Sequence, residues 1–159
     1  MAAYGTYLEA NEYFQNRLYT LAWDEASSKN KTIALEEATQ RIDRLRFSGV
    51  KVDETQELEF PRYYLEYDGT DLGPEGDEEI PEDIQIATYE LAYCLLDGVD
   101  PDLELENLII TQQKYSTIQM NRSLGTLEYI VAGIPSATAW RHLLPYLAPS
   151  RPIRIHRVS

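Results

Sequence analysis

The side chains that could carry out chemistry do not stand at spacings that would let them act together. The chain has two histidines, His142 and His156, and one cysteine, Cys94. A zinc site needs about four close nitrogen, sulfur or oxygen ligands, and neither histidine has a cysteine or a second histidine at ligand spacing. Cys94 lies beside the apolar stripe of a predicted helix, so we interpret it as a buried small hydrophobe rather than a nucleophile.

The remaining signatures of catalysis are equally weak. The glycines at 69, 73 and 76 stand among acids that would repel a phosphate, and there is no G-x-S-x-G motif. The segment Asp68–Asp71 hints at calcium, but it lacks the ordered oxygens and the position-twelve Glu of an EF-hand. Dense Asp and Glu residues are ordinarily a solvated face. We therefore expect no enzyme activity, no cofactor and no metal, and function has to be argued from assembly.

Charge is divided unevenly along the chain. Residues 1–128 hold all 27 acids and ten of the 14 Lys and Arg, a net charge of −17, whereas residues 129–159 hold four Arg and no acid. A cationic C-terminal end on an anionic body predicts a segment that binds the acidic surface of another protein. The acidic body disfavours binding to free nucleic acid, because affinity for phosphate comes largely from Lys and Arg. A surface with this negative charge would suit a passage through which DNA slides.

Bulk composition predicts one domain made inside a cell. The chain has 159 residues, 43% of them apolar, which is enough to bury a core. A single cysteine excludes an intramolecular disulfide and fits a reducing compartment. The N-terminus lacks the basic and apolar regions of a signal peptide, and no run approaches the roughly 20 apolar residues of a membrane span.

Periodic apolar residues and capping signals predict about four helices, so the fold class is mainly α, a small helical bundle. The first runs from Thr6 to about Arg17 after a capping box of Thr6 and Glu9, and the second begins near Ser27 and ends before Gly49. The third opens at Pro81 and ends at Gly98, and the fourth spans about 136–147. The expected buried residues are Leu35, Ala38, Ile42 and Leu45; Ile84, Ala87, Leu91 and Leu95; and Trp140, Leu143, Leu144 and Leu147. We expect Trp23, between the first two helices, to be a buried core residue that holds their connection in place.

The segments between the helices predict a two-stranded β element and an acidic loop. Residues 107–121 are rich in Ile, Thr and Tyr, which favour strands. Residues 50–80 are dense in acids and broken by glycines, which predicts an extended loop that does not pack on its own body. Tyr63, Tyr64 and Tyr67 in this loop are a possible interface arm. We expect one domain over 1–148 and an extended basic tail over 149–159.

The C-terminal tail is the predicted partner-binding segment. Its residues Ile153 and Ile155 alternate with Arg154 and His156 as in a strand, so the tail could add a strand to the sheet edge of a neighbour. A frayed terminus is the alternative. The residues expected to contact a partner protein or a neighbouring subunit are Arg151, Ile153, Arg154, Ile155 and Arg157.

Several short motifs, taken in order, resemble one family. They are Thr6-x-x-Glu9 with Tyr13-Phe14, Ala22-Trp23, Ala26-Ser27, Ala34-Leu35, Ala38-Thr39, Ile42-Asp43, Gln56-x-Leu58-x-Phe60-Pro61-Arg62, Ile80-Pro81, Leu91-Ala92, Leu96-Asp97-Gly98 and Leu143-Leu144-Pro145-Tyr146-Leu147. This pattern resembles the head-to-tail connector, or adaptor, proteins of tailed bacteriophages, some of which are catalogued as single-stranded-DNA-binding primosomal proteins.

The resemblance implies a virion structural protein at the head–tail junction, assembled in the host cytoplasm. Such proteins form a ring, commonly of twelve copies, under the portal protein; the ring extends the DNA channel and docks a downstream tail protein. Packaged double-stranded DNA would pass through without specific binding, and no membrane would be involved. The alternative is a single-stranded-DNA-binding replication accessory protein, in which the Tyr63, Tyr64 and Tyr67 cluster would stack on bases.

Overall fold

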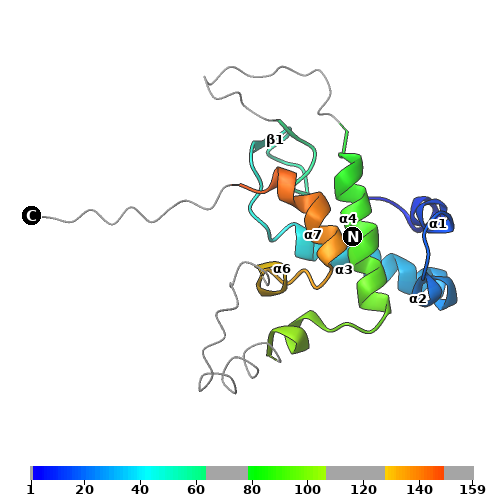
Figure 1. Cartoon of the computed structure of the whole chain (residues 1–159). Helices are drawn as coiled ribbons and strands as arrows, with labels where there is room; N and C mark the ends of the chain where they lie inside the picture. Colours follow the sequence, from blue (N-terminus) through cyan, green and yellow to red (C-terminus); the bar gives the residue numbers. More distant parts are fainter. Residues whose placement is uncertain (1, 64–78, 107–127, 149–159) are drawn as a thin grey trace, which may run out of the picture.

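The computed structural model is mainly helical, with a small two-stranded antiparallel sheet, which confirms the predicted fold class. It describes residues 2–63, 79–106 and 128–148. Helix α4 (Glu82–Leu96) lies at the centre, and α3 (Ser28–Ile42) and α7 (Ala137–Leu143) make its most extensive contacts (Figure 1). The short helix α2 (Leu21–Glu25) also contacts α4, whereas α1 (Tyr7–Gln15) packs against α3.

Helix α1 begins with the predicted capping box. The Thr6 hydroxyl accepts from the Glu9 amide at 3.3 Å, and the Glu9 carboxylate accepts from the Thr6 amide at 2.7 Å. Two orphan amides of the first turn are thereby satisfied. In α1, Ala10 and Phe14 are buried, whereas Leu8 is exposed. The helix ends at Gln15, so Leu18 lies in the following turn and is exposed as well.

The apolar stripes of α3 and α4 are confirmed. In α3, Leu35, Ala38 and Ile42 are buried, and in α4, Ile84, Ala87 and Leu91 are buried. Leu45 and Leu95 at the ends of the two stripes are partly buried against the same core. Helix α4 starts one residue later than predicted, with Pro81 as its cap. These facing stripes hold α3 and α4 together, because burying each aliphatic side chain stabilises the fold by about 1.5–3 kcal/mol.

Helix α3 ends at Ile42, earlier than the predicted end before Gly49. The following segment is extended and pairs with the end of the described chain: Phe47 and Leu147 form an antiparallel bridge. The Ser48 amide donates to the Tyr146 carbonyl at 2.9 Å, and the Ala148 amide donates to the Arg46 carbonyl at 2.8 Å. A helix continued to residue 48 would have used these backbone groups within itself.

Residues 50–63 form a packed hairpin, so the prediction of an extended loop from residue 50 is wrong for this part. Strand β1 (Val50–Lys51) pairs with β2 (Arg62–Tyr63), and Val50 lies opposite Tyr63. Phe60 anchors the hairpin: it is buried, and its ring centroid lies 4.7 Å from that of Phe47. The stabilisation from burying this one aromatic side chain outweighs the electrostatic cost of bringing the surrounding acids close to the rest of the protein.

The charges of the hairpin are paired locally. Arg62, which is buried, contacts the Glu59 carboxylate at 2.6 Å, and Lys51 contacts the same carboxylate at 3.0 Å. The Arg62 guanidinium also donates to the carbonyls of Ser48 and Gly49, both at 2.8 Å. The two basic side chains of this acidic hairpin thus converge on one carboxylate, a contact that its charge count does not predict.

Tyr4 connects the N-terminus, α3 and the hairpin. Its side chain is fully buried, its hydroxyl donates to the Asp43 carboxylate, and that hydroxyl accepts from the Phe60 amide at 3.1 Å. The Tyr4 amide donates to the Thr39 hydroxyl at 3.1 Å. Burial raises the pKa of Tyr4 and that of Asp43 above their ordinary values. The first residues are therefore part of the core.

The last helical region is divided in two. Helix α7 is capped by Ser136 and continues as a 3₁₀ turn, η2 (Leu144–Tyr146), at Pro145, which ends the α-helix as predicted. Leu143 is buried and Leu147 partly buried, but Leu144 is exposed, contrary to the prediction, because the change of helix type turns it away from α4. The short helix α6 (Glu128–Val131) precedes α7, and residues 101–106 are helical after α4.

Trp23 is buried as predicted, although it lies on α2 and not in an irregular connection. The predicted β element over 107–121, the tail over 149–159, and Tyr64 and Tyr67 lie outside the described residues. The sheet that the structure describes is the hairpin of β1 and β2, and Tyr63 belongs to it as a half-buried strand residue.

Candidate interaction surface

A buried ion pair joins the turn after α1 to the central helix. The Glu90 side chain on α4 is 2% exposed, and its carboxylate contacts Arg17 Nε at 2.6 Å and Arg17 Nη2 at 2.8 Å. The Tyr13 hydroxyl donates to the same carboxylate at 2.7 Å. Each carboxylate oxygen is thus satisfied, which a buried acid requires. Burial, followed by the hydrogen bond to Glu90, raises the pKa of Tyr13 above its ordinary value.

Aromatic rings hold the Arg17 guanidinium in place. Its central carbon lies 4.6 Å from the ring centroid of Tyr93 and 5.7 Å from that of Phe14. Such contacts favour a cation that is partly removed from water. Arg17 Nη1 also lies 3.5 Å from the Leu18 carbonyl and 3.4 Å from the Tyr19 carbonyl, long contacts that bring the turn close to its own arginine. These contacts of Arg17 therefore hold the conformation of the turn on the side that faces the core.

The outside of this turn is apolar. Leu18 is 77% exposed, Tyr19 87% and Leu21 67%, and we call these three residues the α1–α2 knob. Tyr19 has φ of +60°, the left-handed region that side chains other than glycine enter at a cost of roughly 1–2 kcal/mol. Strained backbone of this kind concentrates at functional positions. Here the strain places three large apolar side chains in solvent, where they contribute little to the stability of a lone subunit.

A surface depression lies beside the knob, between α1, α2 and the start of α3. Its floor is held by Asn11, whose side-chain oxygen accepts from Trp23 Nε1 at 2.9 Å and from Lys31 Nζ at 3.0 Å. The Lys31 ammonium lies 5.1 Å from the Trp23 ring centroid. The depression is lined by Asn11, Phe14, Gln15, Arg17, Thr20, Trp23, Asp24 and Lys31. It has a mixed polar and aromatic lining, and its charges have partners: Arg17 pairs with Glu90, Lys31 donates to Asn11, and Asp24 accepts from the Thr20 hydroxyl.

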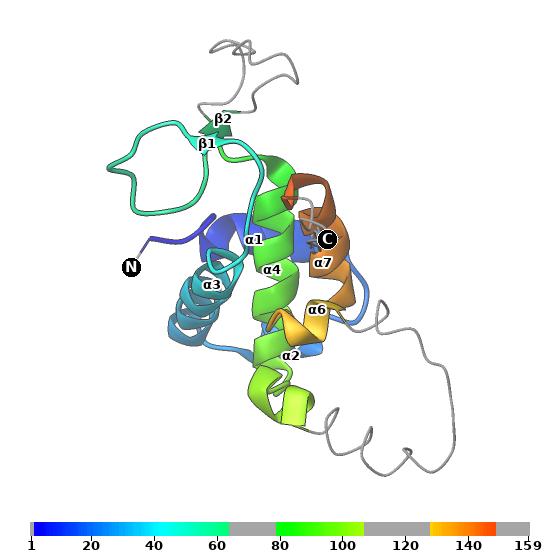
Figure 2. The same cartoon turned by 90° about the vertical axis from the view of Figure 1, so that its left-hand side faces the viewer.

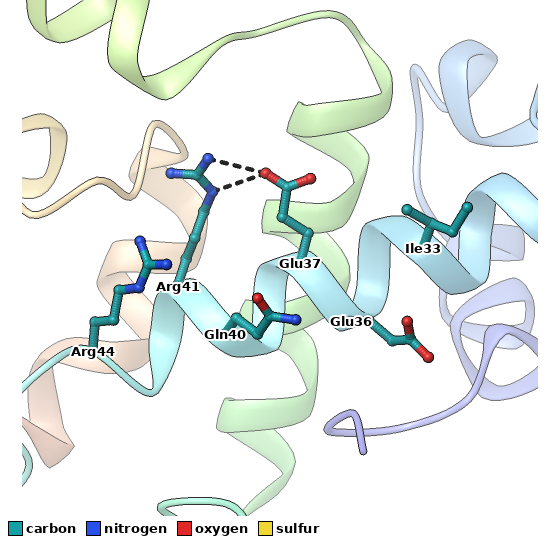
Figure 3. A pocket seen from close by; sticks show the side chains of 6 residues that line it. All are labelled: Ile33, Glu36, Glu37, Gln40, Arg41 and Arg44. Atoms are coloured by element: carbon teal, nitrogen blue, oxygen red, sulfur yellow. Dashed lines mark hydrogen bonds and ion pairs between the residues drawn. The ribbon is translucent and has the colours of Figure 1, made fainter. Parts of the chain in front are cut away.

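A second depression runs along the outer face of α3, where Figure 3 shows its six lining side chains. Glu37 and Arg41, four residues apart on α3, form an ion pair here with a shortest distance of 3.0 Å. Ile33 and Arg44 stand at its two ends (Figure 3). An exposed pair of this type contributes only about 0.3–0.5 kcal/mol. The chemistry of this depression is that of an open, mixed-charge helix surface.

Two further groups that could carry out chemistry, His142 and Cys94, are each engaged with a neighbour. His142 Nδ1 lies 2.8 Å from an Asp83 oxygen, which ties α7 to the start of α4. The Cys94 thiol donates to the Pro135 carbonyl at 3.8 Å, and burial raises its pKa to about 11. Among the described residues no three or more His, Cys, Asp or Glu gather where they could hold a metal ion. Within the same residues every helix is too short or too polar to cross a bilayer.

The residues predicted to bind partners lie mostly outside the described ranges. Outside the described residues lie the tail residues Arg151–Arg157, and also Tyr64 and Tyr67. Tyr63 lies in β2. The structure does not bring Tyr63 to the knob, because the hairpin and the α1–α2 turn lie on different sides of α4 (Figure 1). The sequence-based prediction of partner-binding residues did not include the knob. Its signal was the run Arg17-Leu18-Tyr19-Thr20-Leu21, three bulky apolar residues at a predicted helix end.

The fold and this surface together define a small, acidic, mainly helical protein with a rigid apolar turn. A family described as "Putative DnaT-like ssDNA binding protein" matches residues 1–139, and the chain therefore belongs to that family. No curated protein and no solved structure matches the chain. The family description says nothing of a head-to-tail connector, so that part of the resemblance stays a prediction.

Proposed function

We propose that the chain is a virion structural protein of a tailed bacteriophage, a head-to-tail adaptor that forms a ring under the portal. The observation that carries this proposal is the α1–α2 knob. Leu18, Tyr19 and Leu21 are exposed on a strained turn that a buried ion pair and two aromatic rings hold in shape. A rigid apolar projection suits contact with another protein surface, because little conformational entropy is lost on binding.

The charge of the protein supports the same proposal. The chain carries −13 overall, and residues 79–106, which include α4, hold nine acids and neither Lys nor Arg. An acidic ring would repel the DNA that passes through it and so keep that DNA mobile. The motif pattern quoted for the connector proteins spans most of the described chain. As adaptor, the protein would act by packing against neighbours, without bond chemistry.

The adaptor proposal is tested on purified particles of the phage that encodes the chain. Mass spectrometry should find it as a virion component, and electron cryo-microscopy should place it in a ring between the portal and the tail. Its absence from intact, infectious particles would reject the adaptor role. The isolated chain offers a second readout: a ring former should give higher oligomers in sedimentation velocity as its concentration rises.

Binding to single-stranded DNA is the second candidate, and the family description favours it. Tyr19 offers a stacking surface, since it is 87% exposed, and base stacking on an aromatic side chain is worth roughly 1–3 kcal/mol. The net charge of −13 opposes it, because phosphates are bound largely by cations, and the nearby Arg17 is engaged with Glu90. Adaptor function is therefore ranked first.

Fluorescence anisotropy separates the two candidates. A labelled oligonucleotide is titrated with the wild-type chain and with Tyr19→Ala at near-physiological salt. The adaptor proposal expects weak binding that Tyr19→Ala leaves unchanged. Tight binding that falls with rising salt and is lost in Tyr19→Ala would reverse the ranking.

A further inference from the structure

Two exposed apolar side chains lie on the side of the molecule that α6 and α7 form. Val131, at the end of α6 before α7, is 60% exposed, and Leu144, the first residue of η2 after α7, is 50% exposed. Arg141 is exposed and precedes Leu144 by three residues, so the two side chains lie on one face of the helical turn. Arg46 is also exposed, and its carbonyl accepts from the Ala148 amide, which places it beside the end of η2. We call Val131, Arg141, Leu144 and Arg46 the α6–α7 face.

This face and the α1–α2 knob lie on opposite sides of the molecule. Helix α4 stands between them: α2 and α7 each contact α4. In Figure 1, α1 and α2 lie to one side of α4 and α6 and α7 to the other. Figure 2 looks onto the α6–α7 side, and α4 passes in front of α1. The two apolar surfaces are therefore separate and point in different directions.

The two surfaces carry opposite charge. The segment from Tyr7 to Glu25 bears four exposed acids, and its one base, Arg17 in the turn between α1 and α2, is held by the buried Glu90. The acids are Glu9, Glu12, Asp24 and Glu25. On the other side three exposed arginines, Arg44, Arg46 and Arg141, stand against one exposed acid of α6 and α7, Glu128, and none of the three forms an ion pair among the described residues. An acidic apolar surface and a basic apolar surface are complementary in both respects.

We infer that the α1–α2 knob of one copy docks on the α6–α7 face of a second copy of this chain. The inference rests on the proposed function and names the contact from which the ring is built. Contact between two different faces is head-to-tail, and repeated contacts of this kind close into a ring or extend into a filament. A two-fold dimer would instead bring the same face of both copies together, so that acids would meet acids or arginines meet arginines.

The test uses two variants, each of which disables one surface. Leu18→Asp/Leu21→Asp disables the knob, and Val131→Asp/Leu144→Asp disables the α6–α7 face. All four positions are exposed, so circular dichroism and thermal melting should match those of the wild type. Sedimentation velocity over a concentration series should show self-association of the wild type. Each variant alone should bind itself roughly 30-fold more weakly or not at all.

Mixing the two variants gives the decisive result. The knob variant keeps an intact α6–α7 face and the face variant keeps an intact knob, so an equal mixture should form one-to-one dimers and nothing larger. The matched control is Leu103→Asp, at a residue that is 53% exposed in the helical segment 101–106 after α4, and it should associate like the wild type.

Other outcomes overturn the inference. A face variant that still self-associates while the knob variant does not would indicate knob-to-knob pairing. A mixture that stays monomeric, or a wild-type chain that stays monomeric at the highest concentration measured, would remove the proposed contact. These failures are distinct from failure of the adaptor role, because that role is tested independently by locating the protein in purified particles.

Discussion

Arg17 and Glu90 lie 73 residues apart in the sequence and form a two-pronged ion pair with contacts of 2.6 and 2.8 Å. The carboxylate comes from the central helix and the guanidinium from the strained turn after α1. The pair thus couples the core of the protein to the most exposed apolar side chains it has. Its contribution and that of other contacts can be measured.

Removing the carboxylate should destabilise the fold strongly. In Glu90→Ala the Arg17 charge is left partly buried without its partner, and loss of one member of a buried pair costs about 3–5 kcal/mol. Urea unfolding followed by circular dichroism measures this loss. The matched control, Glu37→Ala, breaks the exposed pair with Arg41 and should change the unfolding free energy by less than about 0.5 kcal/mol. Equal losses in both variants would contradict the structural role of Glu90.

Replacing both charges should recover much of that loss. Arg17→Met/Glu90→Leu removes the ion pair and leaves apolar groups in its place, which in buried sites is often close to neutral. We expect the double variant to unfold at higher urea than Glu90→Ala. The exposed turn should nevertheless become easier to cleave by a protease, since Arg17 no longer holds it. A double variant less stable than Glu90→Ala would show that the pair itself is the main source of stability.

The capping box of α1 should contribute in a pH-dependent way. Thr6→Ala removes the side-chain cap and should cost about 1 kcal/mol of unfolding free energy at neutral pH. Hydrogen bonds from the Thr6 amide and from the Thr6 hydroxyl hold the pKa of Glu9 below its usual value, and the variant loses the one from the hydroxyl, at 2.8 Å. The stabilisation from that bond is present above the usual pKa and is lost as the pH falls through the lowered pKa. The difference between wild type and variant in urea unfolding should therefore shrink at low pH.

The Cys94 thiol should react slowly in the folded protein. Burial raises its pKa to about 11, so the thiolate that attacks a disulfide reagent is scarce at pH 8. Labelling with an aromatic disulfide reagent at that pH should be at least tenfold slower than in urea, where the thiol titrates normally. Fast labelling of the native protein would indicate an activated cysteine and would reopen a catalytic interpretation.

Deleting residues 149–159 separates folding from assembly. The predicted partner contacts lie in this tail, whereas the backbone pairing of residues 46–48 ends at Ala148. We expect helix content and the melting temperature to stay nearly unchanged while assembly onto the partner is lost. Loss of folding on deletion would show that the tail belongs to the core.

The sequence predicted the long helices well because their signals are local. The stripe Leu35, Ala38, Ile42 and the box of Thr6 and Glu9 each lie within a few turns of one helix, and the structure confirms both. The hairpin could not be predicted in this way. It depends on Phe60 reaching Tyr4 and Phe47 across long stretches of chain, and its acids gave the opposite signal.

The interaction surface was harder to predict than the fold. Leu18 fits the apolar period of the first helix, and only the early end of α1 at Gln15 turns it outward. The partner of Arg17 could not be named either, because a buried acid at Glu90 looks in sequence like any other member of an acidic chain. Contacts between distant segments decide both cases.

The bridge between Phe47 and Leu147 bears on where the chain can be cut. Family similarity stops at residue 139, in the middle of α7, yet the buried Leu143 and both hydrogen bonds of the bridge lie beyond it. A fragment trimmed to the recognisable sequence would lose about half of α7 and leave the Ser48 amide and the Arg46 carbonyl without their partners. The smallest piece that can fold as the whole does must extend to Ala148.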